Sequence, residues 1–194
     1  MKKIFALLLA AVMVLSMVAC GENKPTESTP ETTVPPTTEP APVAESALEI
    51  LETVWAQFGE DEKFFVMGGD FDNMVDGAPG KATNTDFFSG NLLVPADQIA
   101  NITDAAAMTH GMNANTFTGA AYAVADAKAF ATAMQTAIQG NQWICGFPEK
   151  MLIVTLSDDY AVVAFGSADI VDNFGTKLAD SYETAETVVD APLA

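Results

Sequence analysis

The distribution of apolar residues divides the chain into three parts. An apolar run from Ile4 to Ala19, interrupted only by Ser16, follows Lys2 and Lys3. Residues 21 to 45 contain almost nothing apolar, whereas from Ser46 onward apolar residues recur with the periods of helices and strands. We therefore expect a leader at 1–19, a tether at 20–45 and a single globular domain at 46–194.

Within the domain, apolar residues spaced three and four apart predict helices. Each of the three longer segments follows a Ser or Asp residue, and these residue types cap helix N-termini. The first segment also has Glu49 three residues after Ser46, which is the spacing of a capping box. The expected helices are 46–59, 126–140 and 167–181, with a short fourth helix at 86–92.

Short apolar runs bounded by turn residues predict the strands. The expected strands are 64–67, 102–112, 117–124, 151–156, 160–165 and 184–189. The order strand, strand, helix then occurs twice, over 102–139 and 151–181. This order predicts an α+β fold, with an antiparallel sheet, helices on one face, and two strand-strand-helix units after an N-terminal helix.

The leader has the layout of an export signal, and its apolar run is shorter than the roughly 20 residues that a membrane-spanning helix needs. Its last residues, Met17-Val18-Ala19 before Cys20, resemble the lipobox of bacterial lipoproteins. The resemblance implies that Cys20 is diacylated on sulfur, becomes the mature N-terminus and anchors the protein to the cell membrane, facing the extracellular side. An ordinary secretory signal followed by a cysteine is the alternative.

The tether is rich in proline, threonine and glutamate, so it cannot bury enough surface to fold and is expected to act as a spacer. In polyproline II it would reach about 75 Å at most. A proline-rich ligand for a partner domain is the alternative, but such ligands carry flanking basic residues and only Lys24 is present.

Charge and composition exclude several classes of partner. The chain without its leader has 26 acidic residues and six lysines, a formal charge of −20, which opposes binding to nucleic acid and anionic lipid. There is no arginine and no glycine-rich phosphate loop, so phosphorylated substrates are not expected. The expected partners are the membrane, through Cys20, and an unidentified protein or small molecule, without nucleic acid.

Three motifs in the domain carry a second resemblance. They are Met112-Asn113-Ala114-Asn115, the stretch from Gln142 to Pro148, and the hairpin that ends at Ala164-Phe165-Gly166. Over residues 95 to 182 the chain resembles a family of small lipoproteins of Gram-positive type bacteria that has no established activity. The resemblance implies a location at the cell surface and implies no reaction.

Two groups of residues have the chemistry of metal ligands. Met108, His110 and Met112 offer soft ligands for copper. On one strand the two methionines would lie about 13 Å apart, so one ion needs a bend at Gly111, and a methionine-lined core strand is the ordinary alternative.

The second group, Asp70, Asp72 and Asp76, invites a calcium hypothesis. The EF-hand spacing fails, however, because Met74 and Val75 occupy positions of a ligand and of the required glycine. A solvated turn is the alternative.

No catalytic residue or cofactor is assigned. If Cys20 carries lipid, Cys145 has no intrachain partner, and its aromatic surroundings predict a buried, inert thiol rather than a nucleophile paired with His110. Trp55, Trp143 and Phe147 could line a groove for sugars or apolar ligands, although such residues usually form core. We expect a non-catalytic binding module. The alternatives are a structural or assembly factor of the cell envelope and an unrecognised extracellular hydrolase.

Overall fold

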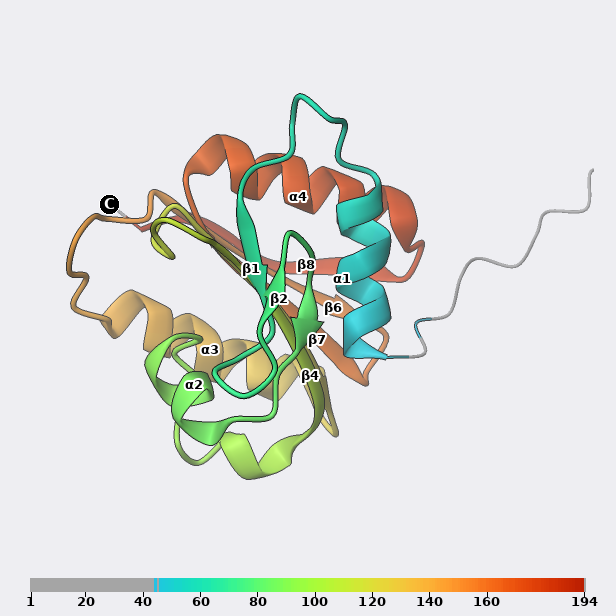
Figure 1. Cartoon of the computed structure of the whole chain (residues 1–194). Helices are drawn as coiled ribbons and strands as arrows, with labels where there is room; N and C mark the ends of the chain where they lie inside the picture. Colours follow the sequence, from blue (N-terminus) through green and yellow to red (C-terminus); the bar gives the residue numbers. More distant parts are fainter. Residues whose placement is uncertain (1–43, 45, 194) are drawn as a thin grey trace, which may run out of the picture. The chain divides into compact units, whose positions relative to one another are not determined.

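The computed structural model describes Ala44 and residues 46 to 193, so the leader and Cys20 lie outside the described residues. Twelve regular elements follow one another along the described chain, with a 3-10 turn, Ile99–Asn101, before β4 (Figure 1). The helices are α1 (Ala47–Ala56), α2 (Thr85–Gly90), α3 (Ala127–Gly140) and α4 (Ala168–Ser181). The strands are β1 (Val66–Gly68), β2 (Val75–Asp76), β3 (Gly80–Lys81), β4 (Ile102–His110), β5 (Phe117–Val124), β6 (Lys150–Leu156), β7 (Tyr160–Gly166) and β8 (Ala185–Pro192).

The strands form one antiparallel sheet in the order β2-β1-β4-β5-β7-β6-β8, and β3 pairs with β4 beside β1. The predicted α+β class, the antiparallel sheet and the two strand-strand-helix units are confirmed. The two terminal strands differ greatly in length, since β2 has two residues and β8 has eight. The sheet therefore has one long edge, which is β8.

Helices cover both faces of the sheet, so the expectation of helices on one face is wrong (Figure 1). Residues of α2 and α3 pack with Tyr122, Ile153 and Val163 on one face, whereas α1 and α4 pack with Val154 and Ala164 on the other. The physical reason is visible in β5, β6 and β7, which are apolar and buried on both sides. Strands without alternation require cover on both faces.

Side chains that cap the helices explain where they begin. Ser46 and Asp126 accept hydrogen bonds from backbone N–H groups in the first turns of α1 and α3, as predicted. Ser167 makes no such bond, and the carboxylate of Glu149 instead accepts one from the backbone N–H of Ala168 at 2.9 Å. The start of α4 is thereby tied to the residue that precedes β6.

Candidate functional site

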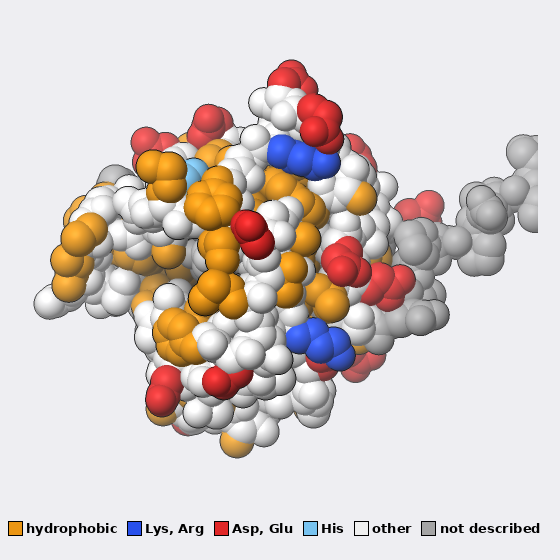
Figure 2. Space-filling model, in the orientation of Figure 1, with side chains coloured by type: hydrophobic (Ala, Val, Ile, Leu, Met, Phe, Trp, Pro, Cys, Tyr) orange, Lys and Arg blue, Asp and Glu red, His pale blue; other side chains and the backbone are white. Residues whose placement is uncertain are grey.

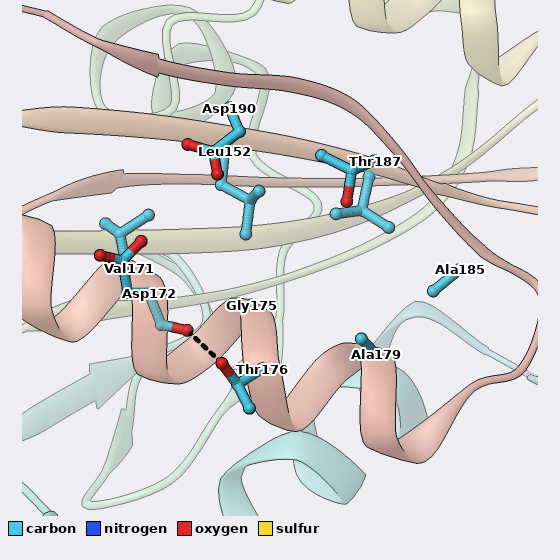
Figure 3. A pocket seen from close by; sticks show the side chains of 10 residues that line it. Leu152, Val171, Asp172, Gly175, Thr176, Ala179, Ala185, Thr187 and Asp190 are labelled. Carbon is cyan, nitrogen blue, oxygen red and sulfur yellow. Dashed lines mark hydrogen bonds between the residues drawn. The ribbon is translucent and has the colours of Figure 1, made fainter.

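A groove lies between α4 and the edge strand β8 and has a volume of about 340 Å³ (Figure 3). It forms because α4 packs on β6 and β7, while β8 continues the sheet beyond β6. Leu152 and Val154 of β6 form its floor. The residues that line its walls are Val171, Asp172, Gly175, Thr176 and Ala179 from α4 and Ala185, Thr187 and Asp190 from β8.

Two local features give the groove its shape. A Cβ at Gly175 would lie 2.6 Å from Cδ2 of Leu152, so glycine allows α4 to approach β6 closely at this point. The pairing of β6 with β8 is irregular, because Ile153 pairs with Val189 and Val154 pairs with Thr187. Such a bulge reverses the direction of side chains along a strand. Thr187 consequently lines the groove, whereas Val189 packs in the core beneath α3.

One end of the groove carries a cluster of three charges. The ammonium group of Lys150 forms ion pairs with Asp172 of α4 and with Asp190 of β8, the latter at 2.6 Å. These contacts, that with Asp172 foremost, raise the pKa of Lys150 above its ordinary value. The side chains of Asp172 and Asp190 are 57% and 51% exposed, and that of Lys150 is 19% exposed. The cluster joins the two walls and has a net charge of −1.

The groove also offers hydroxyl groups to a ligand. The hydroxyl of Thr176 donates to the backbone carbonyl of Asp172 at 2.9 Å (Figure 3). Thr187 forms no side-chain hydrogen bond within the part of the chain that the structure describes, so its hydroxyl is available. A concave apolar surface with a few polar groups is the usual form of a small-ligand site.

The lining residues limit the chemistry that the groove can offer. They include no His, Cys or Lys, and the side chains that carry oxygen atoms are Asp172, Thr176, Thr187 and Asp190. Asp172 and Asp190 are two acids at a cleft, but both are bound to the ammonium group of Lys150. Glycoside hydrolysis needs one acid of a pair to donate a proton to the leaving group. In this structure both carboxylates are engaged by Lys150 instead.

The three residues proposed for copper are not brought together. Met108 is completely buried in the core that packs against α1 and α4. The ring of His110 stacks on Phe64 at 5.6 Å, and its Nδ1 accepts a hydrogen bond of 3.2 Å from the backbone N–H of Met112. The Met112 side chain lies beyond the end of β4 and is 83% exposed. One thioether is thus in the core and the other in solvent.

The acidic loop, residues 70 to 76, contains one buried carboxylate, that of Asp70, and this group accepts backbone hydrogen bonds. Asp70 accepts from the backbone N–H groups of Asp72, Asn73, Thr83 and Asn84, and it is only 3% exposed. Burial alone would raise the pKa of Asp70, but these four donors outweigh it and lower the pKa to about 2.

The remaining acids of that loop are not arranged around a common point for calcium. Asp72 accepts a hydrogen bond from the side-chain amide of Asn84 at 2.8 Å, and Asp76 is exposed in β2. Within Ala44 and residues 46 to 193, no group of three or more His, Cys, Asp or Glu side chains is placed to hold a metal ion. The Asp70 carboxylate orders the loop instead.

Two of the motifs singled out in the sequence, Met112 to Asn115 and Gln142 to Pro148, meet in space. The side-chain amide of Asn113 donates to the carbonyl of Cys145 at 3.1 Å. The amide of Asn115 donates to the carbonyls of Ile144 at 2.8 Å and Gly146 at 3.0 Å. These bonds hold the loop between α3 and β6, residues 141 to 149, against the turn between β4 and β5.

This arrangement displays three large apolar side chains, which we call the apolar tip: Met112, Ile144 and Phe147, with exposed fractions of 83%, 78% and 65%. Figure 2 shows hydrophobic side chains near the single histidine and also down the middle of the same face. Cys145 is exposed and has a φ of 64°, so the expectation of a buried thiol is wrong.

The two tryptophans serve the core rather than an open groove. Trp143 packs against Phe165 with ring centroids 5.3 Å apart, and Trp55 packs between Phe58 and Phe64 at 5.0 and 5.3 Å. Of the three aromatic residues considered for a ligand groove, Trp55 is buried, Trp143 is partly buried and Phe147 is exposed.

Sequence reasoning missed the groove between α4 and β8. Its residues are small or aliphatic and come from three separate elements, so no motif marks them. The only signal was the small pair Gly175 and Ala179, one turn apart on α4.

No helix among the described residues has the length and hydrophobicity to cross a membrane. Comparisons of the chain with protein-family models, with curated proteins and with solved structures find no match.

Proposed function

We propose that this chain is a membrane-anchored extracytoplasmic lipoprotein whose domain is a non-catalytic binding module. The single observation that supports binding is the α4–β8 groove, with an apolar floor and a charged cluster at one end. The similarity of Met17 to Cys20 to a lipobox supports the anchor. Two or three acyl chains on Cys20 are enough for stable attachment, whereas one chain binds only marginally.

The anchor is tested by replacing the acylated residue. Cys20→Ser is expected to remove incorporation of labelled fatty acid and to release the protein from the membrane or leave an uncut precursor. Cys145→Ser is the matched control, because it replaces the other cysteine of the chain and leaves Cys20 in place. Unchanged labelling and fractionation of Cys20→Ser would contradict the anchor.

The groove is tested with the chain from residue 20 onward carrying Cys20→Ser, which contains every described residue. Its thermal unfolding is measured against a panel of sugars, peptides and small amphipathic molecules. A ligand at 100 times its dissociation constant adds about 2.7 kcal/mol to the free energy of unfolding, so a true ligand raises Tm clearly.

Two tryptophan variants locate the binding. Thr187→Trp fills the groove from β8 and is expected to abolish the rise in Tm. Val188→Trp places the same side chain on the next residue, which is 39% exposed and does not line the groove, so binding is expected to persist. Equal effects of the two substitutions would contradict a ligand site in the groove.

A role as an assembly factor is the second candidate, and the apolar tip favours it. Large exposed apolar side chains held on an ordered loop are typical of protein-contact surfaces. If the tip binds an envelope protein, Ile144→Ser together with Phe147→Ser removes the complex without altering ligand binding in the groove. Retention of the complex by this variant excludes the tip as the contact surface.

A further inference from the structure

Resting on the proposed function, we propose that the ligand of the α4–β8 groove is an amphipathic monocation: an aliphatic chain that ends in a primary ammonium group. The aliphatic part lies on the floor of the groove, and the ammonium group reaches Asp172 and Asp190. A free alkylamine and a lysine side chain of a peptide share this chemistry.

The apolar half of the ligand is selected by the floor and walls. Leu152 and Val154 lie at the bottom, and Ala179 and Ala185 contribute small aliphatic surface at the sides. No aromatic side chain lines the groove, and its volume of about 340 Å³ is near the lower limit of small-molecule sites. A slender aliphatic chain fits this space better than a large ring system.

The charged half is selected by the two carboxylates. Lys150 pairs with Oδ1 of Asp172 and Oδ1 of Asp190. In the described part of the chain, the second oxygen of each carboxylate accepts no hydrogen bond. Because both side chains are more than half exposed, an incoming ammonium group can reach these oxygens from the groove. The cluster keeps a net charge of −1, which a monocation neutralises.

The charged residues around the groove also favour a positively charged ligand. α4 carries three aspartates and one lysine, Lys177, which is paired with Glu62 at 3.0 Å. β8 carries no lysine and two acids, of which Asp190 lines the groove, whereas Glu186 does not line it and is paired with Lys128 of α3 at 2.9 Å. An anionic head group would meet two carboxylates whose neighbouring ammonium group already has two partners. Electrostatic complementarity therefore excludes anions and prefers cations.

The experiment compares three probes with the same six-carbon chain, namely hexylammonium, 1-hexanol and hexanoate. Dissociation constants are measured by ligand-detected NMR with the chain from residue 20 onward carrying Cys20→Ser. Exposed ion pairs are weak, so hexylammonium is expected to bind about two- to fivefold more tightly than hexanol. Hexanoate is expected to bind more weakly than hexanol, and the preference for the cation is expected to shrink at 1 M salt.

Two variants test whether the preference for hexylammonium depends on the cluster of Lys150, Asp172 and Asp190. Asp190→Asn is expected to bring hexylammonium to the affinity of hexanol, whereas Asp61→Asn, an exposed aspartate outside the groove, keeps the wild-type preference. A lysine-containing tripeptide with blocked ends distinguishes the two sources. Tighter binding of the peptide than of hexylammonium supports a peptide ligand, and weaker binding supports a free amine.

The outcomes separate this inference from the proposed function. If hexanol or hexanoate binds as tightly as hexylammonium and Thr187→Trp abolishes the binding, the groove is a ligand site and the cationic class is wrong. An unchanged preference for hexylammonium in Asp190→Asn also overturns the cationic class. If no probe binds and the wider panel gives no rise in Tm, the proposed function itself is contradicted.

Discussion

Replacement of Asp70 by asparagine is expected to weaken the domain more than any change to another acid of the same loop. The Asp70 carboxylate accepts four backbone N–H donors from two segments, one directly after Asp70 and one at Thr83 and Asn84. An asparagine keeps one oxygen but turns an NH2 group toward donors that have no acceptor. Buried donors left without a partner cost about 1–3 kcal/mol each.

The lowered pKa of Asp70 expresses the same four hydrogen bonds in a second way. The carboxyl group has a pKa of about 2 in the folded chain against a reference value of 3.8. This difference corresponds to about 2 kcal/mol in favour of the ionised form. Because both magnitudes describe the same hydrogen bonds, they are not added, and Asp70→Asn is expected to lower the free energy of unfolding by about 2–3 kcal/mol at pH 7.

The sign of the pH dependence follows from the lowered pKa. The contribution of Asp70 is fully present above pH 3.8 and is lost as the pH falls through about 2, since the unfolded chain binds the proton first. Urea unfolding between pH 7 and pH 2 measures the effect. Between pH 7 and pH 2 the free energy of unfolding of the wild type should fall by about 2 kcal/mol more than that of Asp70→Asn.

Asp76→Asn is the control, because Asp76 is exposed in β2 and surface changes usually alter stability by less than about 0.5 kcal/mol. If Asp70→Asn unfolds at the same urea concentration as Asp76→Asn, the four hydrogen bonds do not stabilise the loop as argued. If the free energy of unfolding falls equally for wild type and Asp70→Asn between pH 4 and pH 2, the low pKa of Asp70 is refuted.

Three further predictions concern other parts of the domain. Gly166→Ala should lower the free energy of unfolding, measured in urea, by more than about 2 kcal/mol, because Gly166 has a φ of 155° and a Cβ there would lie 2.3 Å from the carbonyl oxygen of Thr116. Gly140→Ala is the control and should not destabilise the domain, because a Cβ at Gly140 would have no atom within 4 Å. Asn115→Ala removes two hydrogen bonds to the 141–149 loop. The backbone amides of this loop should therefore exchange with solvent hydrogen faster, while the free energy of unfolding of the whole domain falls by about 1 kcal/mol. Lys150→Met leaves two carboxylates facing each other and should lower Tm at low salt, with a smaller loss at 1 M salt.

The elements of this fold were predictable because their periodicity is strong. Phe130, Met134 and Ile138 recur on one side of α3, and all three are buried as that spacing requires. The cover of both sheet faces was also present in the sequence, as the unbroken apolar run from Ala161 to Phe165. The expectation of helices on one face came instead from the order of the strands and helices, which does not show how many faces of the sheet are apolar.

The candidate site was not predictable for a physical reason. The groove depends on how closely α4 approaches β6 at Gly175 and on the bulge that directs Thr187 toward the helix. Both features arise from packing between distant segments. Asp70 shows the same limit, since its acidic loop suggested a cation while half of its backbone donors come from residues 83 and 84. The partners of a side chain, rather than its type, decide what it does.

The most direct test of a ligand site in the α4–β8 groove is an amide chemical-shift map of the chain with a ligand that raises its Tm. Our proposal predicts shifts concentrated in Ala168–Ser181 and Ala185–Pro192, with smaller shifts at Leu152 and Val154, and their loss in Thr187→Trp. Shifts centred instead on Met112, Ile144 and Phe147 would place binding at the apolar tip and contradict the groove as the functional site.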